Sequence, residues 1–165
     1  MKPNTCTRVI LTGLLLSFVA LSSFEPALWA QAPWGNLSTP QAQRNVMRDV
    51  QGQVNLLRNA TRTACNFASG GFESVYQQFE TLRGLYSAFT QTLNSQQASR
   101  GANQIAELAG GLNILAEAFT NYQDDVANGR DLRAALSDMC HVLNEAAAVW
   151  LQEFNKDCLQ LRVGW

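Results

Sequence analysis

The sequence has few residues that stop a helix and few that carry catalytic chemistry. Its 165 residues include only four prolines and one histidine, and 15% of them are charged. No proline follows Pro40, so beyond that point only glycine can interrupt a helix. A single histidine also excludes the two Glu-x-x-His pairs that a carboxylate-bridged di-iron centre needs.

The charges are nearly balanced. The chain holds 12 basic and 13 acidic residues, and removal of residues 1–30 would leave 10 and 12, a net charge of −2. A balance of this kind gives no reason to expect nucleic acid as a partner.

The first thirty residues have the layout of a secretory signal peptide. Lys2 and Arg8 precede the apolar run 9–21, and the small-residue site 28–30 follows. A charged start, a short apolar middle and a cleavable end predict removal of residues 1–30. The alternative is an uncleaved anchor, but the run of about 13 residues is shorter than the roughly 20 that span a bilayer. We therefore expect an exported protein, periplasmic or secreted, with no transmembrane segment in the mature chain.

Apolar residues recur at spacings of three and four through the rest of the chain. This rhythm places each set on one face of a helix, and such a face needs a partner surface. No stretch alternates in twos, so no strand is expected. After an extended leader at 31–39, the predicted helices are 40–67, 72–95, 100–128 and 131–162.

Short links join the predicted helices. Thr39-Pro40 is a favourable helix start, because the hydroxyl can cap the first turn and proline suits the first helical position. Residues 69–71 and 95–101 form the next two links, and Asn128-Gly129 ends the third helix with a glycine suited to a left-handed cap. Short links make consecutive helices antiparallel, so residues 40–165 are predicted to be an up-down-up-down four-helix bundle. An elongated or domain-swapped helical dimer is the alternative.

Three cysteines remain once Cys6 is removed with the leader. Cys140 and Cys158 are 18 residues apart on one predicted helix, about 27 Å along its axis, so they cannot bridge each other. When the cores of the first and last helices are aligned, Cys65 and Cys140 come to the same height. The sequence therefore predicts a Cys65–Cys140 disulfide, unless all three cysteines are simply small buried hydrophobes. Cys158 would then stay buried and reduced, or link a homodimer.

The Cys140-His141 pair resembles half of a c-type haem attachment motif. The motif is C-x-x-C-H, and its first cysteine position is Ser137 here. His141 also shares the polar side of its helix, where nearby carboxylates would pair with it. We expect no haem, no metal site and no catalytic group with a base beside it, so the protein is predicted not to be an enzyme. The acids of the helices mostly fall off the apolar faces: Glu73, Glu80, Glu107, Glu117 and Asp125.

A row of arginines lies opposite the apolar face of the first predicted helix. Arg44, Arg48, Arg58 and Arg62 stand against a single acid, Asp49. Such a row could dock an anionic protein, polysaccharide or lipid headgroup. The alternative is a solvated face with no partner.

Glycines and aromatic residues give two further candidates. Gly110-Gly111 interrupts the third predicted helix, which indicates either close helix packing or a shallow groove for a partner helix. The aromatics are expected to form core near one end of the bundle, or to edge a small apolar ligand site: Phe72, Tyr76, Phe79, Phe119 and Tyr122.

Taken together, the sequence predicts an exported, non-catalytic accessory protein that binds another protein or an anionic envelope component. The alternative is a bundle that holds haem or a small apolar molecule between its helices.

Overall fold

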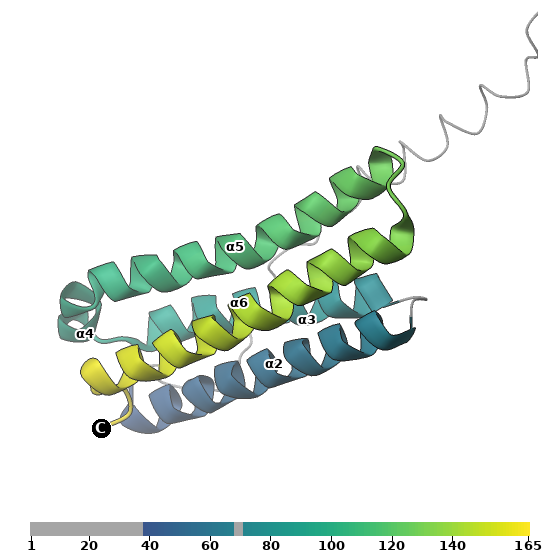
Figure 1. The fold of residues 1–165 in the computed structure, drawn as a ribbon. Helices are drawn as coiled ribbons and strands as arrows, with labels where there is room; N and C mark the ends of the chain where they lie inside the picture. The colour runs from purple at the N-terminus through teal and green to yellow at the C-terminus, as the bar shows by residue number, and fades with distance from the viewer. Residues whose placement is uncertain (1–37, 68–70) are drawn as a thin grey trace, which may run out of the picture. The chain divides into compact units, whose positions relative to one another are not determined.

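A computed structural model of the chain describes residues 38–67 and 71–165, and its regular structure there is entirely helical. The predicted all-α fold is confirmed for this part, which contains five helices and no strand (Figure 1). The predicted signal peptide and residues 31–37 of the leader lie outside the described residues. The helices are α2 (Pro40–Phe67), α3 (Gly71–Thr92), α4 (Ser95–Arg100), α5 (Ala102–Ala127) and α6 (Leu132–Gln160).

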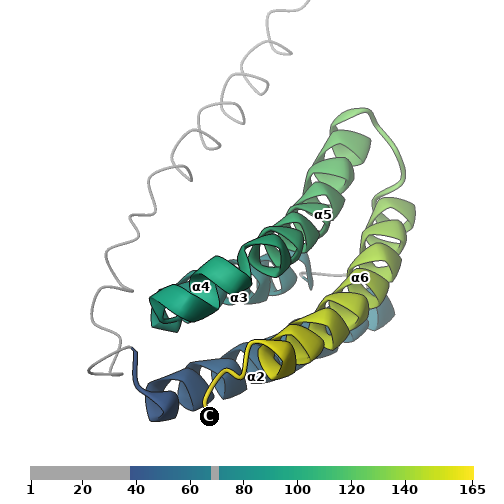
Figure 2. The same cartoon turned by 90° about the vertical axis from the view of Figure 1, so that its left-hand side faces the viewer.

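The four long helices pack side by side along most of their length. α2 lies against both α3 and α6, and α5 lies against α6 (Figures 1 and 2). Each of these neighbours runs antiparallel to the helix it contacts (Figure 1). None of the described helices is both long enough and apolar enough to cross a membrane.

The core is formed by one apolar stripe from each long helix. The spacing of three and four residues that predicted the helices also predicts which side chains are buried, because it keeps them on one face. α2 contributes a run of small β-branched residues, which lets α3 and α6 approach its backbone closely. The fully buried apolar residues of α2 are Val46, Val50, Val54 and Leu57.

Aromatic rings fill the space between α3 and α5. Phe72 of α3 stacks on Tyr122 of α5 with ring centroids 4.7 Å apart, and Phe79 lies 5.1 Å from Phe119. Because the rings are large, they hold the two helix backbones farther apart than the aliphatic contacts elsewhere. These residues belong to the core or pack against it, in agreement with the first of the two interpretations of the aromatic set.

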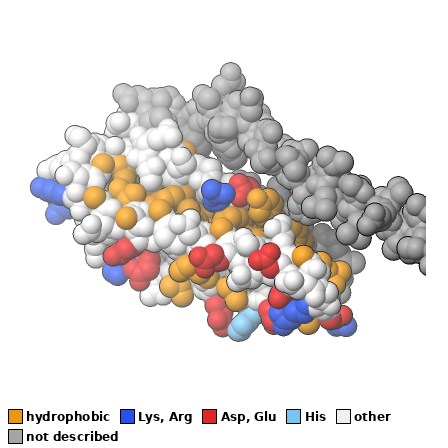
Figure 3. Space-filling model, turned by 90° about the horizontal axis from the view of Figure 1, so that it is seen from above, with side chains coloured by type: hydrophobic (Ala, Val, Ile, Leu, Met, Phe, Trp, Pro, Cys, Tyr) orange, Lys and Arg blue, Asp and Glu red, His pale blue; other side chains and the backbone are white. Residues whose placement is uncertain are grey.

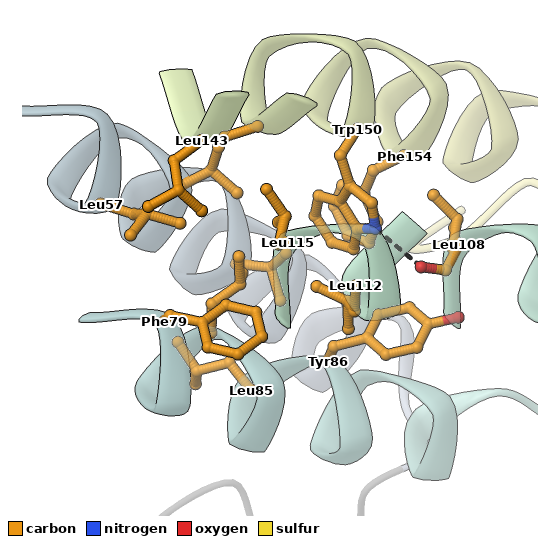
Figure 4. Close-up of a cluster of buried hydrophobic side chains, with 14 of the residues drawn as sticks. Leu57, Phe79, Leu85, Tyr86, Leu108, Leu112, Leu115, Leu143, Trp150 and Phe154 are labelled. Carbon is orange, nitrogen blue, oxygen red and sulfur yellow. Dashed lines mark hydrogen bonds between the residues drawn. The ribbon is translucent and has the colours of Figure 1, made fainter. Parts of the chain in front are cut away.

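The contact between α5 and α6 centres on Trp150. Its indole Nε1 donates a hydrogen bond of 2.8 Å to the carbonyl oxygen of Leu108, and its ring stacks on Phe154 (Figure 4). A side chain can reach a helix carbonyl in this way because Gly111, one turn later, has no Cβ. A Cβ built there would lie only 2.6 Å from Cδ1 of Trp150. Gly111 is therefore explained by close helix packing.

Helix ends follow the signals in the sequence. The Thr39 hydroxyl accepts a hydrogen bond of 3.1 Å from the N–H of Ala42, which caps α2. Gly129 adopts the left-handed conformation, with φ of 81°, at the end of α5. The Asp131 carboxylate then accepts a hydrogen bond of 3.0 Å from the N–H of Ala134 and caps α6.

The link predicted at residues 95–101 is instead mostly the short helix α4, and α3 ends at Thr92 rather than at residue 95. The cause is a capping box. The Asn94 side chain accepts a hydrogen bond of 2.8 Å from the N–H of Gln97, and the Gln97 side chain accepts one of 3.1 Å from the N–H of Asn94. These bonds start a new helix after a single break in the chain.

A buried amide joins the start of α2 to the end of α3 and to the C-terminal residues. Gln43 is 3% exposed, and its Nε2 donates hydrogen bonds of 2.8 Å to the carbonyl of Thr92 and to Oε1 of Gln97. Its Oε1 accepts a hydrogen bond of 2.8 Å from the N–H of Gly164. A buried amide with all these bonds made fixes one arrangement of the three segments, because any other leaves polar groups unpaired.

The two adjacent glycines of α5 provide a matched test of this packing. Gly111→Ala should lower the free energy of unfolding by about 1–3 kcal/mol, because the new methyl group displaces the Trp150 ring. Gly110→Ala should raise it by up to about 1 kcal/mol, because a Cβ at Gly110 meets nothing within 4 Å and alanine favours helix. Urea unfolding followed by circular dichroism measures both, and equal effects of the two substitutions would contradict the role of Gly111.

Candidate functional site

The structure brings one of the candidate arginines, Arg62, to the same place as the two candidate cysteines, Cys65 and Cys140, in the groove between α2 and α6. Arg62 lies beside Cys65 on the last turns of α2, and Cys140 faces them from α6. They line a cavity of about 380 Å³ that is otherwise polar. Its described lining residues are Thr61, Arg62, Cys65, Asn66, Ser137, Cys140, His141 and Asn144.

The four arginines of α2 do not form a uniform row. Arg44 joins α2 to the C-terminal residues, because it donates a hydrogen bond to the carbonyl of Gly164. It also donates one of 2.9 Å to Oε1 of Gln41. Arg48 and Arg62 are exposed and Arg58 is half-buried. None of the four forms an ion pair with another described residue. Three unneutralised guanidinium groups therefore remain along this side of α2.

Amide groups line the rest of the groove. The Gln51 side chain on α2 donates a hydrogen bond of 2.7 Å to Oδ1 of Asn155 on α6. Nearer the cavity, Nε of Arg58 and Oδ1 of Asn144 are buried and have no hydrogen-bond partner among the described residues. The two facing helices therefore each leave one buried polar group without a hydrogen bond, a donor on α2 and an acceptor on α6. The polar groups of this groove make only part of the hydrogen bonds that they can form.

The predicted disulfide is not formed in the structure, where Cys65 and Cys140 are both free thiols. The alignment that predicted it is nevertheless correct in height, because both cysteines line the same cavity. They differ in environment. Cys65 is exposed, whereas Cys140 is 1% exposed. Cys158 is also a buried free thiol, at the other end of α6.

Burial controls the protonation of the two buried thiols. It raises the pKa of Cys140 to about 12, and the neighbouring Cys65 adds to the effect. It also raises the pKa of Cys158 to about 12, with a smaller contribution from the Asp157 carboxylate. Both groups are therefore neutral thiols at ordinary pH and poor nucleophiles.

His141 lies at the rim of the cavity and points to solvent. Its side chain is 75% exposed, and its Nε2 lies 3.5 Å from the Glu145 carboxylate. The imidazole makes no hydrogen bond to Cys65 or Cys140 among the interactions of the described residues. A cysteine and histidine in one cavity therefore do not form a nucleophile and base pair here.

Most of the described acidic residues lie on α5 and α6. Figure 3 shows acidic side chains among hydrophobic ones on one face of the molecule. Several are neutralised locally. Arg130 contacts both Asp125, at 2.5 Å, and Asp138, and these residues border a smaller cavity of about 210 Å³. The described part of the chain holds no group of three or more His, Cys, Asp or Glu side chains placed to bind a metal ion.

Sequence reasoning named Arg62 and the two cysteines, which line this cavity, but it did not name the polar residues between them. Asn66, Ser137 and Asn144 carry no motif and are ordinary polar helix residues when taken alone, and Thr61 is buried, 1% exposed, on the apolar face of α2. The alignment of α2 with α6 could have found them, since it places residues 137–144 opposite the last two turns of α2.

No protein-family model, no curated protein and no solved structure matches this chain. Function is therefore inferred from the residues of the groove and from the signals in the sequence.

The two buried thiols make stability fall at alkaline pH. In the unfolded chain a thiol loses its proton near pH 8.5, whereas the folded protein keeps the protons of Cys140 and Cys158 to about pH 12. Unfolding then releases protons, so between about pH 9 and pH 11 the free energy of unfolding should fall by on the order of 1 kcal/mol per pH unit for each thiol. Urea unfolding under reductant measures the slope.

The control for this prediction is the Cys140→Ala/Cys158→Ala double variant. Its stability at neutral pH can differ from that of the parent, but its loss of stability above pH 9 should be shallower. An unchanged slope would show that other groups cause the alkaline loss.

Proposed function

We propose that this chain is an exported, non-catalytic accessory protein that uses the basic side of α2 to bind an anionic protein or envelope component. The observation that carries this proposal is the set of three guanidinium groups, those of Arg48, Arg58 and Arg62, that no described carboxylate neutralises. Arginine side chains that have no internal partner, close to amides with unused hydrogen-bonding groups, commonly bind carboxylate, sulfate or phosphate groups.

The spacing of the arginines suits an extended partner. Arg58 and Arg62 are one helical turn apart, about 6 Å along the axis, and Arg48 lies about 21 Å from Arg62. A compact ligand cannot reach all three groups. A chain with repeated negative charges, such as an acidic polysaccharide, an acidic helix or a row of lipid headgroups, can.

We propose the rest of the architecture on the same basis. The helices α2, α3, α5 and α6 make an antiparallel up-down-up-down four-helix bundle, which is supported by the packing of α2 on α3 and α6 and of α5 on α6. Cleavage after Ala30 releases this unit outside the cytoplasm, which is supported by the charged, apolar and small-residue order of the first thirty residues.

The absence of catalysis is part of the proposal. Its support is that the thiols that line the cavity have no hydrogen-bonded base, and that the described acids are not gathered around a shared site. The interior between the helices is occupied by large side chains, among them Phe79, Phe89 and Phe154, which supports a binding surface outside the bundle rather than a ligand within it.

Charge reversal on α2 tests the binding surface. Arg48→Glu/Arg62→Glu should elute from immobilised heparin at lower salt than the parent, with affinity reduced about tenfold, because each lost surface contact is worth on the order of 1 kcal/mol or less. Arg83→Glu/Arg100→Glu makes the same change of net charge on α3 and α4 and should behave like the parent apart from a small general shift. If both double variants lose affinity equally, net charge and not this face governs binding.

Export is tested by the mass of the mature protein. Expression of the full chain in a bacterial host should give a periplasmic product that begins at Gln31, because signal peptidase cuts after the small residue at position 30. Ala30→Arg should block the cut and keep the longer chain with the membrane. A parent protein that stays uncut in the membrane fraction would instead support an uncleaved anchor.

A further inference from the structure

Two reactive groups of the described structure, the thiols of Cys65 and Cys140, line one cavity. They are 75 residues apart in the sequence and come from the neighbouring helices α2 and α6. One is exposed and the other is buried beneath it, in the wall of the polar cavity between α2 and α6. Neither thiol has a role in the binding surface proposed above.

We propose that Cys65 and Cys140 form a dithiol site that small anionic disulfides oxidise, with Cys65 as the attacking thiol and Cys140 as the resolving thiol. The Cys65 thiolate attacks one sulfur of the reagent, breaks the S–S bond of the reagent and forms a mixed disulfide. The first reagent thiolate leaves and takes up a proton. Cys140 then loses its proton and attacks Sγ of Cys65, which expels the second reagent thiol. The two protein thiols together lose two electrons and become a disulfide, and the reagent disulfide accepts these electrons and becomes two thiols.

Exposure sets the order of the two steps. A reagent in solution reaches Cys65 directly, whereas Cys140 is 1% exposed. Burial also keeps Cys140 protonated, so it is a poor first nucleophile. Once Cys65 carries the reagent, the adjacent Cys140 reacts within the molecule, and proximity compensates for its low thiolate fraction.

The cavity lining sets the preference for an anionic reagent. Arg62 is the one lining residue among those described that is always charged, and no described carboxylate lines the cavity. The Glu145 carboxylate lies behind His141, on the solvent side. The volume of about 380 Å³ is in the range of small-molecule sites, and the neighbouring amides and hydroxyls can accept a peptide-like reagent. Glutathione disulfide has the charge, and one of its two glutathionyl halves has the size.

Cys158 is a built-in control. It is buried like Cys140 and lies on the same helix, but it is about 27 Å away along the axis and so cannot resolve a mixed disulfide on Cys65. Of these two buried thiols, only Cys140 lines the cavity that also holds the exposed Cys65.

Mass spectrometry of the mature protein tests the proposal. Reduced protein is treated near pH 8 with glutathione disulfide, quenched by acid and mapped by peptide digestion without reductant. The parent should lose two thiols, gain no lasting adduct and yield a Cys65–Cys140 linked peptide. Cys140→Ala should retain one glutathionyl group on Cys65, and Cys65→Ser should react at neither Cys140 nor Cys158.

Charge is tested by comparing two reagents. Glutathione disulfide is anionic and cystamine is cationic. Arg62→Gln should slow the reaction with glutathione disulfide by on the order of fivefold relative to cystamine, since one partly screened charge contributes about 1 kcal/mol. Arg100→Gln is the matched control and should leave the ratio unchanged. Circular dichroism of each variant confirms that it is folded before its rate is used.

Three results would overturn the proposal. A parent protein that keeps a stable glutathionyl group on Cys65 would show that Cys140 does not resolve. A linked peptide that contains Cys158 would show that the pairing is wrong. An equal effect of Arg62→Gln on both reagents would remove the preference for anionic disulfides.

Discussion

The contact between α2 and α6 is the constraint on which the rest of the structure depends. These are the first and last long helices of the described chain, and they pack along each other. Short links alone would keep α2 with α3 and α5 with α6, and this contact, together with the rings between α3 and α5, joins the two pairs into one core. Hydrogen bonds occur along this contact, between Gln43 and Gly164 at one end and between Gln51 and Asn155 in the middle. Such bonds have defined geometry, so they fix the register in a way that apolar packing cannot.

The same contact concentrates the features with functional potential. Arg62, the thiol pair and the polar cavity lie along it, whereas most of the described acidic residues lie on α5 and α6. One helix therefore serves two purposes. The apolar face of α2 builds the core with valines, and its outer face presents charge. The half-buried Arg58 stands at the boundary between these faces, and its Nε is left without a described partner.

Much of the fold is readable from the sequence because local rules decide it. Apolar spacing gives the helices, Thr39 and Asp131 cap two of them, and Gly129 ends a third. The short helix α4 was not predicted, because a polar run without apolar spacing looks like a loop unless the capping box at Asn94 is recognised. Only part of the candidate site can be predicted from the sequence. The charged residues and cysteines can be picked out directly. The amides and hydroxyls between them can be recognised as cavity lining only when two helices distant in sequence are known to pack against each other.

The order of the helices also has a kinetic consequence. The pairs α2–α3 and α5–α6 are each made by contacts between residues close in sequence, so their chain entropy cost is small. The contact of α2 with α6 closes a loop of about 75 to 120 residues and must wait for both pairs. We expect the chain to fold as two helical hairpins that dock late. The bond of Gln43 to Gly164 and the meeting of the two thiols would then report the final docking step rather than the formation of the helices.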